Sequence, residues 1–596
     1  MRTVSNNNTQ TQPGTGGEPN PSFERNDRSR ALIHLLFTIA AGGAVYGLFF
    51  NRGIWLSVVG YSVAPAERVL YGEVPYRDFL FNYTPGILWL NGLLMKLFGV
   101  GLMPIQVGLL VFKLLTLLML SVLSLKLMRG WYAILPVALT LVWLGHRFIF
   151  NVHPTQYSML FVLIGLSCML KYDEQGKVRW LLLCGLSIGI VFLLKYNVGV
   201  AILGLSLIGV LLLEFIKGGG DQMRAGLFSR AVARLAILLS GFGIVVVPVF
   251  LYLASKGALG AMIGHFLHHA SDYSDERAIP LPSIRLVVPF ALLLGLSAAV
   301  VAIVSRKAPR LAGAFVLAIL TAISVCILIP ERMPLLKESA SAAVAYLPPI
   351  LFAVIGISLG VSAMQTLRRE KQLRGWWSTN GPIALVLLFA LGAYLEVYPR
   401  ADYYHLIRVL PPVFLLVALA ADRINALLTE RAGSRPPWRI ASLSTVASLA
   451  LLAVVGVQDT WIPQFDGLRL NDRIPVQLER ARGIYTSERD SRFIDELTDL
   501  IASNSTENDK MFSFARRGGG FYFFANRRNP TKLLWWDSVG IDAQAREEVF
   551  RLIAEKDLKL ILVQDNFADI RARRLLDANY HEVGRASDIV VFDRNQ

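Results

Sequence analysis

PGILWLNGLLMKLFG (residues 85–99) is the stretch that decides the fold of this chain, because it is apolar yet short. As a helix it would extend about 22 Å, whereas the hydrocarbon core of a lipid bilayer is about 30 Å thick. It also carries Asn91 and Lys96. We therefore predict that this stretch forms a juxtamembrane helix at the membrane interface and does not span the bilayer.

The composition of the whole chain predicts a membrane protein. Of the 596 residues, 54% are hydrophobic and 17% are charged, and the mean hydropathy is +0.49. A water-soluble fold could not hide so much apolar surface. We predict a polytopic α-helical membrane protein with about 13 spanning helices. Their predicted positions are 31–50, 105–127, 131–149, 155–171, 180–196, 198–216, 234–254, 286–304, 311–329, 343–364, 380–398, 406–421 and 439–458.

The positive charge follows the loops between these spans. The net charge is +16, but Lys and Arg occur in short clusters and form no basic stripe, so a nucleic-acid partner is not indicated. If residues 85–99 do not span, about 24 positive residues lie on one side and about 12 on the other. The bias predicts a multi-pass protein of the bacterial inner membrane with its N-terminus in the cytoplasm and its C-terminus outside.

Three regions differ in character. Residues 1–30 are rich in Asn, Thr, Gln, Gly and Pro, so we expect a disordered cytoplasmic tail. Residues 31–459 form the predicted membrane domain, which includes a first external loop at 51–104. Residues 460–596 alternate strand and helix patterns and predict an external α/β domain. Its glycine run, in RRGGGFYFFANRRNP (516–530), lacks the spacing of a dinucleotide or P-loop motif, so nucleotide binding is only weakly indicated.

Ionisable side chains of both signs gather at the outer ends of the predicted spans, whereas the inner loops carry mainly Lys and Arg. Charge beside a span is costly and usually serves a function. Cations could bind a phosphate there, and a carboxylate could remove a proton, as a lipid-linked phosphosugar donor would require. The outer set includes Glu67, Arg68, Glu73, Arg77, Asp78, Arg147, His153, Lys195, Tyr196, His265, Arg332, Arg400, Asp402 and His405.

Three blocks of the sequence carry a family resemblance. YGEVPYRDFLFNYTPGILWLNGLLMKLFGVG (71–101) resembles the first external loop of the GT-C glycosyltransferases, the superfamily of the protein mannosyltransferases and of the bacterial aminoarabinose transferase that modifies lipid A. YPRADYYHLIRVLPP (398–412) and FLLKYNVGVAI (192–202) resemble two further blocks. The resemblance implies transfer of a sugar from a polyprenyl-phosphate donor to a lipid, glycan or protein acceptor on the extracytoplasmic face.

One departure from the family pattern concerns the catalytic base. Many relatives carry an acidic residue just after the first span, where this chain has WLSVVGYSVAPAER (55–68). The resemblance therefore implies that Asp78 acts as the base, with Glu67 as the alternative, unless the transfer activity has been lost. We expect Glu67 in a helix before a turn at Gly72, with its side chain toward solvent.

The other outer residues are expected to contact the substrate, and each has a plainer explanation. Asp78 could form a surface ion pair with Arg77, Lys195 could reach from a helix end to the interface, and Asp402 could cap the helix that follows it. The residues predicted to contact the substrate are Arg77, Lys195, Tyr196, Arg332, Arg400, Asp402 and His405.

The sequence does not specify a cofactor. His265 and His269 would share one face of a helix, with Asp272 nearby, so a divalent metal ion is the one cofactor that the pattern allows. A lipid-linked glycan transporter or an O-antigen-ligase-like or polymerase-like membrane protein is the alternative function. The chain shows no internal repeat of the kind that transporters use. The sequence names neither the sugar nor the acceptor.

Overall fold

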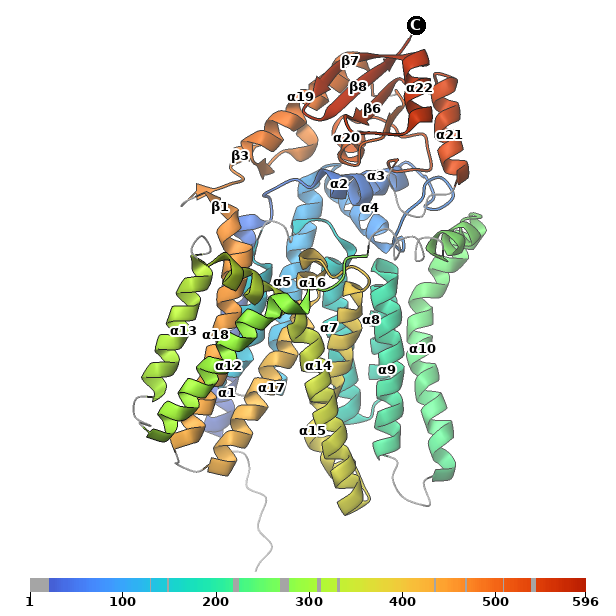
Figure 1. The fold of residues 1–596 in the computed structure, drawn as a ribbon. Coiled ribbons are helices and arrows are strands. Elements are labelled where there is room, and N and C mark those ends of the chain that lie inside the picture. The colour runs from blue at the N-terminus through green and yellow to red at the C-terminus, as the bar shows by residue number, and fades with distance from the viewer. Residues whose placement is uncertain are drawn as a thin grey trace, which may run out of the picture.

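The computed structural model describes residues 21–128, 130–146, 150–217, 224–267, 278–307, 312–329, 333–432, 436–466, 469–507, 509–536 and 543–595. Each predicted span overlaps one helix of a long bundle (Figure 1). The helices are α1 (Pro21–Phe49), α5 (Leu102–Leu127), α6 (Leu135–Leu144), α7 (Pro154–Gln175), α8 (Arg179–Leu194), α9 (Tyr196–Lys217), α10 (Arg224–Ser255), α12 (Ile284–Lys307), α13 (Ala312–Leu328), α14 (Pro334–Glu370), α15 (Arg374–Tyr394), α17 (Leu410–Ala432) and α18 (Pro436–Gly456).

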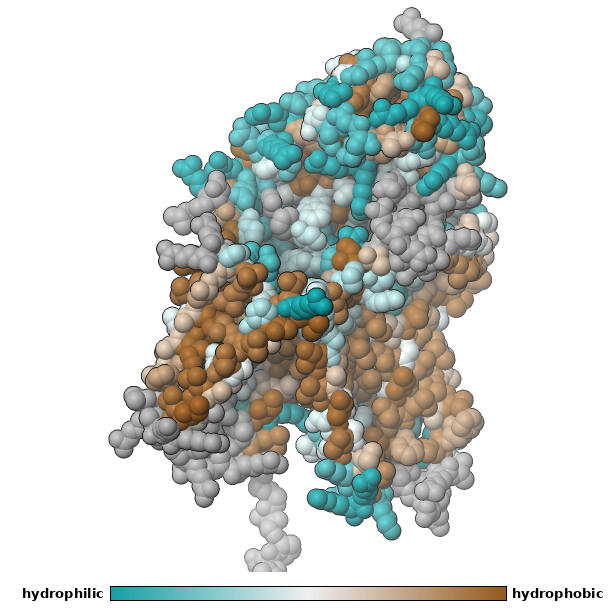
Figure 2. All heavy atoms as spheres, in the orientation of Figure 1, coloured by the Kyte–Doolittle hydropathy of each residue, from teal (hydrophilic) through white to brown (hydrophobic). Residues whose placement is uncertain are grey.

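The surface of the bundle confirms the predicted fold class, a polytopic helical membrane protein with a C-terminal α/β region. In the described part of the chain, nine helices are long and apolar enough to cross a membrane. Figure 2 shows hydrophobic side chains over the bundle and hydrophilic ones over the C-terminal region. Helix α7 is not among the nine, and it has polar residues at both ends, including Thr155, Gln156 and Ser158 near its start. These three side chains are buried inside the bundle and do not face lipid.

The stretch 85–99 forms a short helix, α4 (Gly86–Phe98), in the layer between the bundle and the C-terminal region (Figure 1). Asn91 is fully buried and donates to the carbonyl of Ser62 at 3.1 Å. Apolar side chains at the far end of the helix, Leu97 and Phe98, are 62% and 69% exposed. A helix that buries one face and exposes apolar groups at its end is typical of a membrane interface.

Residues 56–70 of the first loop form a nearly continuous helical segment. It consists of α2 (Leu56–Val58), a π-helical turn (Val59–Val63) and α3 (Ala64–Leu70). The turn after α3 contains Gly72 with φ of +90°, a value that favours glycine, as the sequence predicted. Residues 56–70 lie against the C-terminal region (Figure 1).

The C-terminal region contains the predicted α/β domain. Strand β5 (Met511–Ser513) pairs in parallel with β6 (Leu560–Gln564), and β6 pairs antiparallel with β8 (Ile589–Arg594). The sheet order is β5-β6-β8-β7, where β7 (Tyr580–Ala586) is a strand that the sequence reading missed. The helices α21 (Ala543–Ala554) and α22 (Ile570–Asn579) match the two predicted amphipathic helices. The other elements of the region are β1 (Phe465–Asp466), β2 (Arg469–Leu470), β3 (Ile474–Pro475), β4 (Tyr485–Thr486), α19 (Glu488–Asn504) and α20 (Phe521–Phe524).

Candidate functional site

Asp78 is held in a tight turn of the first loop. Its carboxylate accepts hydrogen bonds from Arg77 Nε at 2.8 Å, from Arg77 Nη2 at 2.7 Å and from the amide of Val74 at 2.7 Å. The hydrogen bond from Arg77 holds the pKa of Asp78 below its usual value. The structure therefore brings together Arg77 and Asp78, but it gives both side chains a role within the turn.

Glu67 is buried, so the expectation that it faces solvent is wrong. Its side chain points toward the C-terminal region, where Arg480 Nη1 donates to its two carboxylate oxygens at 2.8 and 3.0 Å. Tyr71 Oη donates to Glu67 Oε1 at 3.0 Å. Burial raises the pKa of Glu67, and the charge of Arg480 and the hydrogen bond from Tyr71 oppose that rise. Sequence reasoning could not find this contact, because its two partners are 413 residues apart.

Arg480 also forms hydrogen bonds with the segment that follows the glycine run of the C-terminal region. Its Nη1 donates to the carbonyl of Phe523 at 2.8 Å, and its Nη2 donates to Asn526 Oδ1 at 2.6 Å. A single guanidinium group thus joins the first loop to the segment that follows the glycine run.

The glycine run at 518–520 packs against the first loop, and this contact requires glycine at two positions. A Cβ atom on Gly60 would lie 2.9 Å from the carbonyl carbon of Gly519, and one on Gly520 would lie 2.8 Å from the oxygen of Leu56. Both distances are too short for a side chain. The glycines therefore permit two backbones to approach each other closely.

A buried ion pair lies at the end of the bundle nearer the C-terminal region. Lys195, which follows α8, places its Nζ 3.2 Å from Oε1 of Glu396, a residue in the 3₁₀ turn Leu395–Val397. Thr155 Oγ1 donates to the same oxygen at 3.0 Å. Lys195 Nζ also lies 4.2 Å from the centre of the Tyr83 ring, within the range of a cation–π contact. Glu396 Oε2 is buried and has no hydrogen-bond partner among the described residues.

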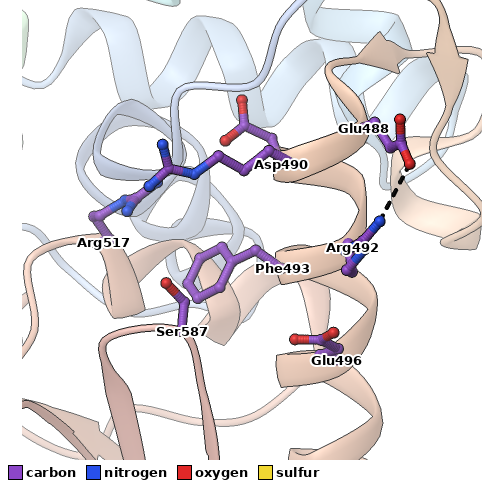
Figure 3. A pocket seen from close by; sticks show the side chains of 8 residues that line it. Glu488, Asp490, Arg492, Phe493, Glu496, Arg517 and Ser587 are labelled. Atoms are coloured by element: carbon purple, nitrogen blue, oxygen red, sulfur yellow. Dashed lines mark hydrogen bonds and ion pairs between the residues drawn. The ribbon is translucent and has the colours of Figure 1, made fainter.

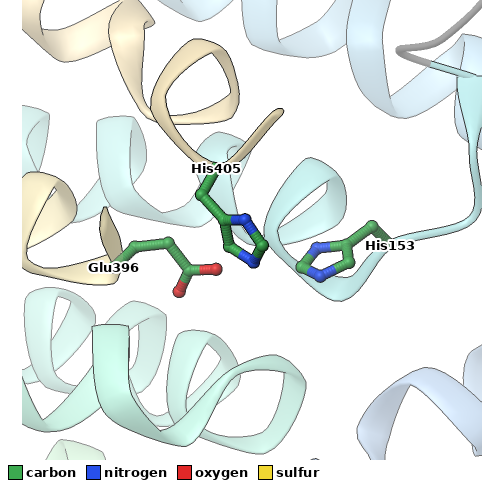
Figure 4. Close-up of side chains that lie close together, drawn as sticks. All are labelled: His153, Glu396 and His405. Atoms are coloured by element: carbon green, nitrogen blue, oxygen red, sulfur yellow. The ribbon is translucent and has the colours of Figure 1, made fainter. Parts of the chain in front are cut away.

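Two imidazoles point toward Glu396 (Figure 4). One is His153, whose Nδ1 accepts from the amide of Thr155 at 3.3 Å and whose Nε2 lies 3.4 Å from Tyr83 Oη. The other is His405, whose ring centre lies 6.2 Å from that of His153. Tyr83 and His153 are therefore part of the site, although the sequence reading did not assign either of them a role.

His405 belongs to the short helix α16 (Tyr403–Arg408), which Asp402 caps as the plainer explanation of that residue predicted. Asp402 Oδ1 accepts from the amides of Tyr404 and His405 at 3.0 and 3.1 Å and lies 2.9 Å from His405 Nδ1. Arg400 Nε donates to Asp402 Oδ2. Burial opposes ionisation of Asp402, but the hydrogen bonds from His405 and Arg400 hold its pKa below its usual range. Burial lowers the pKa of His405, and the hydrogen bond with Asp402 opposes this change.

Two further buried cations were missed by the sequence reading. Arg408 is 5% exposed, and Lys113, inside α5, is 4% exposed. Lys113 Nζ donates to Gln156 Oε1 at 2.8 Å, and neither cation pairs with a carboxylate in the described part of the chain. The available signal was a single charge within an apolar run, in LLVFKLLTLL (109–118) and HLIRVLPP (405–412). Such a charge inside a membrane domain usually marks a functional site.

The distances within the cluster of His153, Glu396 and His405 would allow a metal ion to bind, but the positive charges nearby disfavour one. One donor atom from each of His153, Glu396 and His405 lies within 4.8 Å of the other two. However, Lys195 already pairs with Glu396, and the charge of Arg408 acts on both imidazoles. A divalent cation would lie among like charges, so we assign no step to a metal ion.

The remaining predicted residues lie elsewhere. Tyr196 stacks on Phe266, with ring centres 4.6 Å apart. His265 Nε2 lies 3.1 Å from Asn82 Oδ1. Arg332, His269, Asp272 and Arg147 lie outside the described residues.

A separate groove of about 530 Å³ lies on the C-terminal region (Figure 3). Three of its lining side chains are acidic and three are basic. Arg492 pairs with Glu488 at 3.2 Å, and Arg517 lies over the ring of Phe493 at 5.1 Å. The groove therefore offers little unbalanced charge to a ligand.

Membrane-length helices with buried ionisable groups at one end, below an α/β region, define a polytopic membrane protein with a polar site near one membrane face. Residues 82–218 match the family model described as dolichyl-phosphate-mannose-protein mannosyltransferase. Over these residues the match confirms the predicted resemblance to the GT-C glycosyltransferases. The match covers under a quarter of the chain and reaches from the first loop to the end of α9. No curated protein matches the chain.

Several solved structures align with the chain at low identity. ArnT from Cupriavidus metallidurans bound to undecaprenyl phosphate is 15% identical, with a TM-score of 0.43 over 96% of this chain and 98% of that one. The Archaeoglobus fulgidus oligosaccharyltransferase in complex with Zn and sulfate is 10% identical, with a TM-score of 0.46 over 94% and 73%. None of these TM-scores reaches 0.5, so the family match alone supports the class.

Proposed function

We propose that the protein transfers a sugar from a polyprenyl-phosphate donor to an acceptor hydroxyl, with the donor phosphate bound beside Lys195 and Arg408. The observation that carries this proposal is the surplus of buried positive charge. Lys195 pairs with Glu396 and Arg400 with Asp402, which leaves Arg408 and Lys113 without a carboxylate among the described residues. Buried cations need an anion, and a phosphate would supply one.

The chemistry of such a donor suits this charge distribution. As the bond between the anomeric carbon and the phosphate oxygen breaks, negative charge grows on the phosphate. Cations fixed in a water-poor site would stabilise that charge more than they stabilise the ground state. The donor is thus expected to need positive side chains more than a general acid.

The proton of the acceptor hydroxyl needs a base. The resemblance implies Asp78 or Glu67, and both carboxylates are bound by arginine side chains. In this proposal Arg77, Tyr196 and Arg332 remain candidates for contact with the acceptor or the sugar. The proposed reaction does not use a metal ion.

We further propose that the site and the C-terminal region face away from the cytoplasm. The loop-charge bias supports this orientation, and Figure 1 shows the C-terminal region and α16 toward the same end of the bundle. A reporter fused after Gln596 should be active outside the cytoplasm, and one inserted near Arg374 should be active inside. A cytoplasmic C-terminal reporter would rule out the proposed orientation.

Incubation of purified protein with radiolabelled polyprenyl-phosphate sugars tests the function directly. We expect labelled sugar to move to an acceptor and unlabelled polyprenyl phosphate to be released. Movement of the intact lipid-linked glycan across a vesicle membrane, without cleavage, would instead support the transporter alternative. Joining of whole glycan chains from a lipid carrier would support a ligase.

A further inference from the structure

We propose that His405, oriented by Asp402, is the base that takes the proton from the acceptor hydroxyl. This inference rests on the proposed function and deepens it. It differs from the assignment of the base to a first-loop carboxylate, which the resemblance implies.

The carboxylates of the first loop are poorly placed to accept another proton. The oxygens of Asp78 accept three hydrogen bonds, from Arg77 and from the amide of Val74. Those of Glu67 accept hydrogen bonds from Arg480 and Tyr71. A base bound by a guanidinium group must give up a charge-assisted hydrogen bond before it can act.

The imidazole of His405 is arranged differently. An ionised Asp402 can only accept, so the hydrogen in the 2.9 Å contact lies on Nδ1 of His405, and the lone pair lies on Nε2. Within the described residues, Nε2 makes no hydrogen bond. A carboxylate that fixes the tautomer and direction of an imidazole is the usual support of a histidine base.

The imidazole of His153, the other one in the cluster, has no ring nitrogen without a neighbour. Both nitrogens of His153 have neighbours, the amide of Thr155 on one side and Tyr83 Oη on the other. His153 is only 3% exposed, whereas the side chain of His405 is 15% exposed. An acceptor could therefore approach His405 from the rim of the cluster while the donor phosphate lies deeper, beside Lys195 and Arg408.

The groups around His405 come from several elements. Asp402 and Arg400 precede it, Arg408 lies in its own helix, Glu396 lies in the turn before it, and His153 precedes α7. This mixture of charges lets the imidazole become positive briefly, with Asp402 and Glu396 nearby to stabilise the charge.

The proposed step balances as follows. The acceptor oxygen forms a bond to the anomeric carbon of the donor sugar, and its proton moves to His405 Nε2. The bond between that carbon and the phosphate oxygen breaks, and the electron pair stays on the phosphate. The products are the glycosylated acceptor and polyprenyl phosphate, and the imidazolium then returns its proton to water at the rim.

Kinetics of the purified full-length protein test the role of His405. We expect His405→Ala to lower kcat by roughly 10²- to 10⁴-fold, the range for loss of a positioned base, with unchanged binding of undecaprenyl phosphate. Added imidazole should restore part of the turnover, because it can enter the space that the side chain leaves. Asp402→Asn should lower kcat without rescue by imidazole, because the ring still fills that space. His581→Ala, on the exposed edge of the C-terminal region, is the control and should keep normal kinetics.

The outcomes separate the two proposals. If the unaltered protein binds undecaprenyl phosphate but transfers no sugar, the proposed function fails, and the role of His405 fails with it. If the unaltered protein transfers sugar and His405→Ala keeps its turnover, only the role of His405 is overturned. A loss in His405→Ala that imidazole does not relieve, with weaker donor binding, would make His405 a binding residue and also overturn the proposal.

Discussion

Arg480 Nη1 donates to both carboxylate oxygens of Glu67, at 2.8 and 3.0 Å, and so ties the C-terminal region to the first loop. The two side chains are 17% and 8% exposed, which makes this pair one of the better shielded in the described part of the chain. Together with the glycine contact, it fixes the segment 56–70 in place.

Removal of Arg480 should destabilise the protein strongly. Arg480→Ala leaves Glu67 buried without its cation, which costs about 3–5 kcal/mol in comparable buried pairs. We expect a lower Tm in detergent and a loss of turnover. Arg492→Ala is the matched control, because its pair with Glu488 is exposed on both sides and should contribute about 0–1 kcal/mol. Equal Tm values for the two variants would contradict the proposed importance of the buried pair.

The glycine contact makes a second prediction. Gly520→Ala would bring a Cβ atom to 2.8 Å from the oxygen of Leu56, so one backbone must shift. Overpacking of this kind typically costs about 1–3 kcal/mol. A thermal melt should therefore show a lower Tm for Gly520→Ala, whereas Gly43→Ala, which has no atom within 4 Å of the new Cβ, should keep or raise it. An unchanged Tm in Gly520→Ala would show that the contact tolerates a side chain.

The cations of the cluster should govern donor affinity. Lys195→Ala, Arg400→Ala and Arg408→Ala are each expected to raise the KM for the donor, since one charge-assisted hydrogen bond contributes about 1.5–3 kcal/mol. Lys126→Ala is the control, because Lys126 pairs with Glu174 at the opposite end of α5. Initial rates at varied donor concentration measure the effect. Normal donor kinetics in all three variants would move the phosphate to other cations.

Asp78 separates the two assignments of the base. If His405 is the base, Asp78→Asn should keep most of its turnover and lose mainly the pair with Arg77, which is partly exposed and contributes little. Glu67→Gln should also fold, because the amide oxygen can still accept from Arg480. A fall of roughly 10²- to 10⁴-fold in kcat for Asp78→Asn, in a protein that remains monodisperse, would restore Asp78 as the base.

Chelation tests the charge argument against a metal ion. Because Lys195 pairs with Glu396 and the charge of Arg408 acts on both imidazoles, we expect extensive dialysis against EDTA to leave turnover unchanged. Added zinc should not raise the Tm. Loss of activity on chelation, with recovery on addition of one metal, would show that a cation replaces Lys195 at Glu396.

The sequence predicted the architecture well, because lipid imposes a simple rule. A spanning helix must be apolar over most of its length, so composition and loop charge were enough to locate the helices of the bundle. The same reasoning separated 85–99 from them. Helix α7 shows the limit of this rule, because a helix buried among others can carry polar residues without showing them to lipid.

The candidate site was predicted only in part. Lys195, Asp402 and His405 were named from the sequence, and the structure brings Lys195 and His405 to the same carboxylate. That carboxylate, Glu396, is 241 residues from its partner Thr155, and no local pattern indicates the pairing. Arg408 and Lys113 were missed because they were taken as parts of apolar spans. Which carboxylates are already bound by arginines could be learned only from the folded chain.

The glycine contact between the first loop and the C-terminal region limits domain exchange. A side chain at Gly60 would collide with the backbone of Gly519, and a side chain at Gly520 would collide with the backbone of Leu56. A hybrid that receives the C-terminal region of another protein would meet a mismatched surface unless residues 56–70 were transplanted with it. The two segments must therefore be exchanged together, although most of the membrane domain separates them along the chain.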